Sequence, residues 1–319
     1  MAHGITEEDK GFVHGTTWHQ LPQFIQLDRP VTKEEARLVL DYPLEKQPLY
    51  RLVDGQPEQV SDAFCIARHD TGRVLLPACG RLMETPSNVE FFNLIDRGLL
   101  AAYPELELES VGTLWGGQTA FVNIKLAEWA VKGDQSPTVS RLMYFNPLGS
   151  SYQACAHDVR IVCNNTLRMA AVSGEVNKTL AKFRHTRGAG ERITEYLLDL
   201  AEVKLGLKRH MELMNELARR EITTVEVERF LGEFLPGPEG PPPIGIKSKR
   251  DEIRNLFEGD QSLGTIGKTR YGLLQATTNW LDHGKLRKNQ DEVSRLWDGI
   301  VGDRSVRKQQ AVDLLVKMA

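Results

Sequence analysis

The sequence predicts an α+β fold: a core of hairpin, helix, three-stranded antiparallel sheet and helix, followed by a helical C-terminal region. Three observations support this fold class. Strand-like segments follow one another through short turns, which favours antiparallel pairing. Helical segments form separate blocks and do not alternate with the strands, unlike a parallel α/β fold. Beyond residue 250 the spacing of apolar residues is mostly helical.

The first elements follow from local signals. The N-terminal thirty residues hold Trp18, Pro22 and Pro30 without regular apolar spacing, so an irregular segment is expected there. Thr32, followed closely by acidic residues, predicts the N-cap of a short helix through Leu40. Residues 49–53 favour a strand that ends in a turn.

The first hairpin is predicted over residues 63–68 and 73–78. These two β-favouring runs flank a turn that contains Gly72. Ser87, with Glu90 three residues later, is typical of a capping box. The apolar residues that follow are spaced as in a helix, so a helix is expected after this hairpin.

A second hairpin is predicted over residues 110–114 and 119–126, joined by a turn with two glycines. The returning strand alternates apolar and polar residues with period two. Residues 141–145 predict a third strand, which ends at Asn146 and Pro147. The core therefore contains a three-stranded antiparallel sheet.

Helices are expected after this sheet. The apolar stripe of Val159, Val162, Leu167 and Met169 predicts a first helix, although Asn164 and Asn165 make it unusually polar. A long amphipathic helix is expected over residues 193–217. Thr223 then predicts the N-cap of a helix that ends near residue 235.

Composition divides the chain into three parts. Residues 1–235 form the predicted α+β core domain. Residues 236–249 begin with a Pro/Gly-rich run that cannot continue a regular element, so they are interpreted as a semi-rigid linker. Residues 250–319 form the predicted helical C-terminal region, with helices over 254–257, 271–283, 293–300 and 306–318.

Charge and composition exclude several classes of protein. Hydrophobic residues make up 41% and charged residues 26% of the 319 positions, as in ordinary globular chains. The net charge of −3 hides an acidic first half and a mildly basic second half. An anionic partner would therefore meet the second half. The N-terminus lacks the features of a signal peptide, and no apolar run reaches the length of a membrane span, so a cytoplasmic protein without membrane contact is expected.

No motif in the sequence predicts catalysis. The four cysteines and eight histidines show no zinc spacing, and no paired-carboxylate or nucleophile motif is present. We therefore expect no metal, no cofactor and no enzymatic activity, while an enzyme with a dispersed site stays open. Residues 262–269 nearly match a phosphate-binding loop, but Ser262 stands where its first Gly belongs. A closely packed loop that leads into the next helix is expected there.

The candidate binding segment is cationic and spans residues 178–192. Lysine and arginine can follow a phosphate backbone, while aromatic rings stack on unpaired bases. Arg160 and Arg168 lie two helical turns apart in the expected helix and would extend this basic surface. A solvated loop is the alternative reading of the same charges. The candidate DNA-binding residues are Arg160, Arg168, Lys178, Lys182, Phe183, Arg184, His185 and Arg187.

An ordered set of short motifs resembles the phage/plasmid-like protein family, a domain of unknown function (number 932) carried on mobile elements. The motifs are A-R-H-D-T-G-R (67–73), F-F-N-L-I-D (91–96), G-T-L-W-G-G (112–117), F-N-P (145–147), V-R-I-V-C-N-N-T-L (159–167) and F-R-H-T (183–186). The resemblance covers about 10–235 and continues in T-T-N-W-L-D-H (277–283). It implies no catalytic residues.

The predicted order of elements is also similar to the core of single-strand annealing proteins of the lambda Red beta and RecT type. This resemblance concerns the fold alone. It implies a groove for single-stranded DNA and subunits that assemble into rings or filaments. The expected function is therefore cofactor-independent binding and annealing of single-stranded DNA by a homo-oligomer that takes part in homologous recombination. The alternative is an accessory protein-interaction module of a phage or plasmid, without DNA activity.

Overall fold

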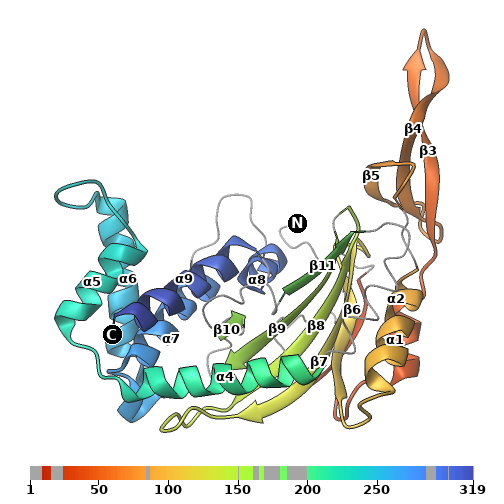
Figure 1. Ribbon diagram of the computed structural model, residues 1–319. Helices are drawn as coiled ribbons and strands as arrows, with labels where there is room; N and C mark the ends of the chain where they lie inside the picture. Colours follow the sequence, from red (N-terminus) through yellow and green to blue (C-terminus); the bar gives the residue numbers. More distant parts are fainter. Residues whose placement is uncertain are drawn as a thin grey trace.

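The computed structural model confirms the α+β class and arranges the chain around one large sheet (Figure 1). The structure describes residues 9–15, 24–83, 87–149, 151–160, 165–168, 180–184, 200–284, 292–300 and 302–318. A separate small sheet projects from one end of the molecule, and the C-terminal helices gather at the other (Figure 1).

The large sheet has eight strands, of which seven follow the order β10-β9-β8-β7-β6-β1-β2, while β11 also pairs with β9. All pairs are antiparallel except β1 with β2. The strands are β1 (Gly11–His14), β2 (Ile25–Leu27), β6 (Glu107–Leu114), β7 (Thr119–Trp129), β8 (Thr138–Pro147), β9 (Ser151–Arg160), β10 (Asn165–Arg168) and β11 (Leu180–Arg184). The three predicted strands β6, β7 and β8 are thus confirmed. The N-terminal segment predicted to be irregular contributes two further strands.

The helix predicted around Val159 is wrong, because this part of the chain forms β9 and β10. β9 pairs with β8 along one edge and with β10 and β11 along the other. Nine consecutive residues of β9, Tyr152 to Arg160, are buried. A strand covered on both faces loses the polar–apolar alternation that identifies a strand in sequence. The spacing of Val159 and Val162 then resembles a helical stripe.

Two short helices with capping boxes cover one face of the large sheet. In α1 (Lys33–Leu40), Thr32 and Glu35 bond to each other's backbone, and Ser87 and Glu90 do the same before α2 (Asn88–Ile95). Both N-caps confirm the prediction. A π-helical turn, η1 (Asp96–Leu100), extends α2. The apolar side chains of these helices, such as Leu40 and Phe92, pack on strand residues such as Val122 to form the first hydrophobic core.

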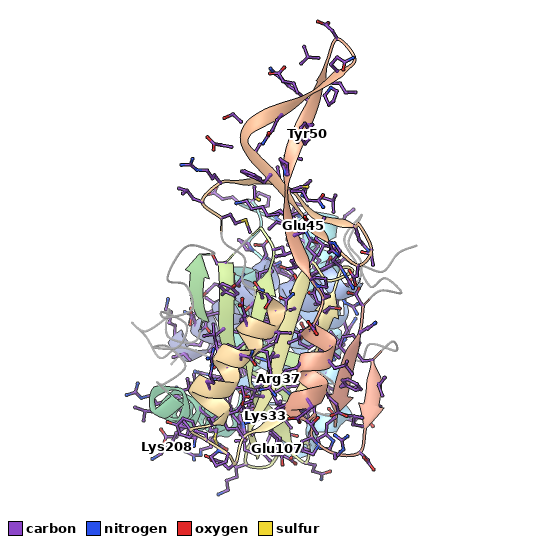
Figure 2. All side chains as sticks on the ribbon, turned by 90° about the vertical axis from the view of Figure 1, so that its right-hand side faces the viewer. Lys33, Arg37, Glu45, Tyr50, Glu107 and Lys208 are labelled. Carbon is purple, nitrogen blue, oxygen red and sulfur yellow. The ribbon has the colours of Figure 1, made fainter. Side chains whose placement is uncertain are left out.

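The small sheet consists of β3 (Leu44–Val53), β4 (Gln56–Arg68) and β5 (Val74–Gly80) in that order. The predicted hairpin corresponds to β4 and β5. β3 and the first half of β4 extend well beyond β5 as a two-stranded ribbon, which points away from the rest of the molecule (Figures 1 and 2). We call residues 44–68 the arm.

The C-terminal part is a layer of helices that packs against the end of the sheet. It comprises α4 (Leu200–Arg219), α5 (Thr224–Phe234), α6 (Ile244–Gly259), the 3₁₀ segment η2 (Gln261–Ile266), α7 (Arg270–His283), α8 (Glu292–Ile300) and α9 (Asp303–Lys317). These helices build a second hydrophobic core. α4 connects the two cores, because Leu207 belongs to the first and Met214 to the second.

The predicted helices of this layer are largely confirmed, with one correction. Thr223 caps α5 in a third capping box, and α7, α8 and α9 begin within three residues of their predicted starts. The predicted linker over 236–249 is too long, since α6 begins at Ile244. Only the Pro/Gly-rich run itself lacks regular structure, because proline prevents helix continuation only where it occurs.

Two glycines in helices should respond oppositely to alanine. A Cβ at Gly272 in α7 would lie 2.1 Å from the carbonyl oxygen of Gly267, whereas a Cβ at Gly206 in α4 meets nothing within 4 Å. We expect Gly206→Ala to raise the free energy of unfolding by about 1 kcal/mol through helix propensity. Gly272→Ala should lower it despite the same propensity gain. Urea denaturation of both variants tests this, and a stabilised Gly272→Ala would contradict the close packing of α7 on the preceding loop.

Candidate functional site

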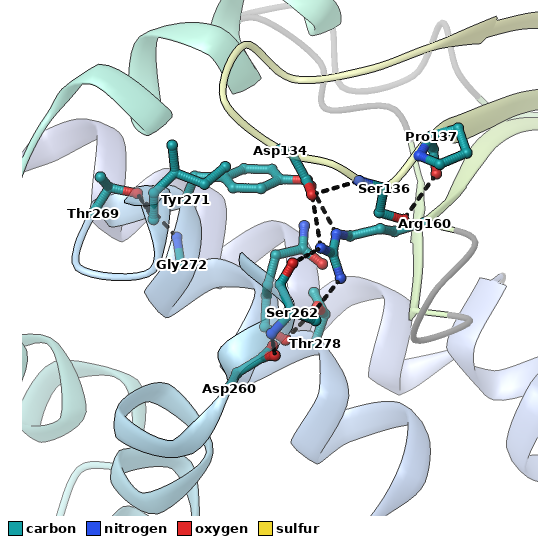
Figure 3. A network of polar contacts seen from close by, with 12 residues as sticks. Asp134, Ser136, Pro137, Arg160, Asp260, Ser262, Thr269, Tyr271, Gly272 and Thr278 are labelled. Atoms are coloured by element: carbon teal, nitrogen blue, oxygen red, sulfur yellow. Dashed lines mark hydrogen bonds and ion pairs between the residues drawn. The ribbon is translucent and has the colours of Figure 1, made fainter. Parts of the chain in front are cut away.

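Arg160 is the first candidate binding residue, and the structure buries it. It ends β9 with only 2% of its surface exposed. Its guanidinium forms two parallel bonds to Asp134, Nε to Oδ2 at 2.7 Å and Nη2 to Oδ1 at 2.8 Å. It also donates to the hydroxyl and the carbonyl oxygen of Ser262, both at 3.1 Å (Figure 3). The prediction that Arg160 contacts DNA at the surface is therefore wrong.

Asp134 is the centre of a polar junction between the sheet and the C-terminal helices. It lies in the turn between β7 and β8, and its Oδ1 accepts the backbone N–H of Ser136 at 2.9 Å. The hydroxyl of Tyr271 in α7 donates to its Oδ2 at 3.2 Å (Figure 3). We call Asp134, Arg160, Ser262 and Tyr271 the polar junction. A bidentate, fully desolvated pair of this kind fixes the relative orientation of the elements that it joins.

Ser262 and the segment after it explain the sequence that resembles a phosphate-binding loop. Helix α6 precedes this segment, where a phosphate-binding loop would follow a strand. Ser262 bonds to Arg160, and Thr269 caps α7 by accepting the N–H of Gly272 at 3.2 Å. These residues thus form the closely packed loop that the sequence predicts.

A second polar chain lies beside the junction. Nε2 of His210 in α4 is 2.6 Å from Oδ2 of Asp158 in β9. Ser140 donates to the other carboxylate oxygen of Asp158, and Trp129 donates to the Ser140 hydroxyl at 2.8 Å. An Asp–His pair orients the imidazole, as in many catalytic sites.

The space beside this pair decides what it can do. His210, Asp158, Arg160 and Tyr271 line a cavity of about 20 Å³, which has room for one water molecule. A substrate pocket is typically about ten times larger or more. The His210–Asp158 pair therefore fits a structural role, in which it joins α4 to the sheet beside a cavity with room for one water molecule.

The face of the large sheet that points away from α1 and α2 carries a strip of buried polar residues. Ser110 in β6 lies opposite Asn123 in β7, and Arg141 in β8 lies opposite His157 in β9. Arg141 is fully buried and forms a bidentate ion pair with Glu109, in which Nη2 donates to Oε1 at 2.8 Å and Nε donates to Oε2. Among the described residues, three of these buried side chains lack a hydrogen-bond partner. They are His157 at both ring nitrogens, Asn123 at both amide atoms and Ser110 at its hydroxyl.

Burial, together with two nearby cations, keeps the ring of His157 neutral. Burial lowers the pKa of His157 well below 6.5, and the nearby cations Arg141 and Lys308 lower it further. Lys308 in α9 is itself buried, with Nζ 2.5 Å from Oδ1 of Asp282 and 2.9 Å from the carbonyl oxygen of Gly299. Burial lowers the pKa of Lys308 while Asp282 opposes this shift. The pairs Arg141–Glu109 and Lys308–Asp282 were not predicted, because residues so distant along the chain leave no local pattern in the sequence.

Part of the cationic segment forms a strand, β11, whereas the alternative reading of its charges was a solvated loop. Lys182, Phe183 and Arg184 lie on β11, opposite Gln153, Tyr152 and Ser151 of β9. Arg168 lies on β10, opposite His157. Lys178, His185 and Arg187 lie outside the described residues. β10 and β11 follow one another along the same edge of β9, so Arg168, Lys182 and Arg184 are distributed over roughly 20 Å of that edge. We call these three residues the basic sheet edge.

The polar junction should be essential for stability. Arg160→Met leaves Asp134 buried without its counter-charge, so we expect a loss of about 3–5 kcal/mol in the free energy of unfolding. The double variant Asp134→Asn/Arg160→Met should recover part of this loss because no unpaired charge remains. As a control, Arg229→Met breaks the exposed pair with Glu233 and should cost less than about 1 kcal/mol. Equal effects of Arg160→Met and Arg229→Met in urea denaturation would contradict the burial of the junction.

His157 should make stability depend on pH. The unfolded chain takes up a proton near pH 6.5, whereas the folded protein does so only at much lower pH. Lowering the pH below 6.5 therefore favours unfolding, by up to about 1.4 kcal/mol per pH unit. His157→Gln should reduce this slope by up to one proton's share, while His69→Gln at an exposed turn should leave it unchanged. Identical slopes for all three proteins would rule out a buried, neutral His157.

No described helix is long and apolar enough to cross a membrane.

The comparisons with known proteins give one match, which is to a protein family. No curated protein and no solved structure is significantly similar to the chain. Residues 84–301 match the family described as "Domain of unknown function (DUF932)", a range that includes the polar junction, the polar strip and the basic sheet edge but not the arm. Since the match spans more than half of the sequence, the chain belongs to the DUF932 family.

Proposed function

We propose that this protein binds single-stranded DNA along the edge of β9 and promotes annealing of complementary strands. It works as a homo-oligomer and needs no nucleotide cofactor. In this proposal the chain is a phage or plasmid protein that acts in homologous recombination, with a core related to the single-strand annealing proteins. The activity involves no covalent step, so it requires no catalytic residues.

The position of the basic residues carries the proposal. Arg168 on β10 and Lys182 and Arg184 on β11 follow one another along a single sheet edge. Cations in a row match the repeating phosphates of an extended strand. Phe183 and His185 supply rings for base stacking, and Lys178 and Arg187 extend the charge at both ends of the segment. A strand held by its phosphates keeps its base edges open for pairing.

Burial narrows the set of residues that can take part. Arg160, Arg141 and Lys308 are basic residues, but each is buried and paired with a carboxylate. Breaking such a pair to bind phosphate would expose the partner acid to the same anion. The proposed DNA contacts are therefore Arg168, Lys178, Lys182, Phe183, Arg184, His185 and Arg187, without Arg160.

The second candidate is a protein-interaction module without DNA activity. The projecting arm favours it, because its ribbon exposes Tyr50 and Leu52 to solvent. Exposed apolar groups on a projecting ribbon are typical of contact with another protein. The two candidates differ in one measurement, since only the first predicts affinity for an oligonucleotide.

DNA binding should depend steeply on salt and on the basic edge. Each phosphate contact to a single strand contributes about 0.7 to the slope of log affinity against log salt concentration. Lys182→Ala/Arg184→Ala should therefore lower that slope by about 1.4 and weaken binding at every salt concentration. Fluorescence anisotropy with a labelled thirty-nucleotide strand between 50 and 300 mM NaCl measures both quantities.

A matched control separates local contacts from general charge. Lys208→Ala/Lys317→Ala removes the same charge at exposed positions on α4 and α9, outside the proposed DNA contacts, so its salt slope should equal that of the wild type. If the two double variants behave alike, the basic edge is not the binding site. If the wild type shows no affinity for single strands at 50 mM NaCl, the DNA proposal fails and the interaction module remains.

A further inference from the structure

The outer part of the arm has no hydrophobic core of its own. Every residue from 50 to 59 is exposed, including Tyr50 at 59% and Leu52 at 78%. β5 pairs with β4 only from Ala63 onward, so two strands alone form this part (Figure 2). A two-stranded ribbon is marginally stable in water unless it packs against something else. No other part of the chain that the structure describes supplies that packing.

The ribbon is amphipathic, which indicates a docking face. Tyr50 lies opposite Gln59, and Leu52 lies opposite Pro57, so one face presents two large apolar side chains and a proline. The other face holds Val53 together with Arg51 and Glu58, and these two form an ion pair at 2.8 Å. Residues 45–62 contain four acidic and two basic residues. This net acidity disfavours nucleic acid and anionic lipid as the partner.

A complementary surface lies at the other end of the same molecule. Ile244 begins α6 and is 88% exposed, and Lys247 and Lys249 are exposed on the following turn. The first turn of α6 has no acidic residue, and no side chain caps its N-terminus. Its backbone N–H groups and helix dipole favour a carboxylate there. Figure 1 shows the loop between α5 and α6 at the end of the molecule opposite the arm.

We propose that the arm of one copy docks on the start of α6 in a second copy. Leu52 packs on Ile244, while Asp54 at the tip of the ribbon approaches Lys247, Lys249 and the N-terminal turn of α6. The apolar contact supplies the packing that the ribbon lacks, and the charges set its direction. Apolar and charge complementarity thus coincide at two surfaces that are exposed among the described residues.

The two surfaces differ, so the contact is head-to-tail. Each copy offers an arm to one neighbour and an α6 surface to another, which builds a closed ring or an open filament. This inference deepens the proposed function, because it names the contact through which the expected homo-oligomer forms. The contact itself needs no DNA, so the two can be tested separately.

A mixing experiment with the full-length chain tests the direction of the contact. Leu52→Ser disables the arm, and Ile244→Ser disables the α6 surface. Light scattering after size-exclusion chromatography should give assemblies for the wild type and monomers for each variant, with at least about tenfold weaker self-association. Equimolar mixing of the two variants should yield a dimer with one copy of each, because one intact arm then meets one intact α6 surface.

An exposed leucine outside both proposed surfaces provides the control. Leu38→Ser on α1 removes an apolar side chain that is 72% exposed, and it should leave assembly intact. Thermal unfolding should show all three variants folded, since each substituted side chain is exposed. A monomeric wild type, assembly of either single variant like the wild type, or no dimer on mixing would each overturn the inference. Oligonucleotide binding by monomeric Leu52→Ser shows independently whether the DNA proposal stands.

Discussion

The buried ion pair between Arg160 and Asp134 is the interaction on which the architecture depends. It fixes the end of β9 to the turn between β7 and β8, and through Ser262 and Tyr271 it reaches η2 and α7. The C-terminal helices are thereby held at a defined position on the sheet. A charge pair is suited to this task because it tolerates few geometries, whereas apolar packing alone permits sliding.

That same constraint removes Arg160 from the proposed DNA-binding surface. With Arg160 committed to Asp134, the basic residues that remain among the predicted DNA contacts of the described strands are Arg168 on β10 and Lys182 and Arg184 on β11. β9 brings both strands onto one edge although 11 residues separate them in sequence. The basic segment gains its significance from this alignment and not from the number of its charges.

The two ends of the molecule represent contrasting solutions to the problem of exposed surface. At the helical end, α6 and α7 bury apolar side chains in the second core, which is formed by residues of the same chain. At the other end, the ribbon extends beyond any core. In the proposed assembly, the start of α6 of a second copy covers the exposed apolar side chains of this ribbon.

The sequence by itself determined the elements that depend on neighbouring residues. The capping boxes at Thr32, Ser87 and Thr223 join residues three positions apart, and in each of the two hairpins the second strand follows the first through a short turn. Only the tertiary structure decided that residues 151–160 form a strand, because burial on both faces erased its alternation. It also decided that Arg160 is structural and Lys182 lies on a sheet edge. Their partners stand 26 and 29 positions away, and no local pattern records a contact over that separation.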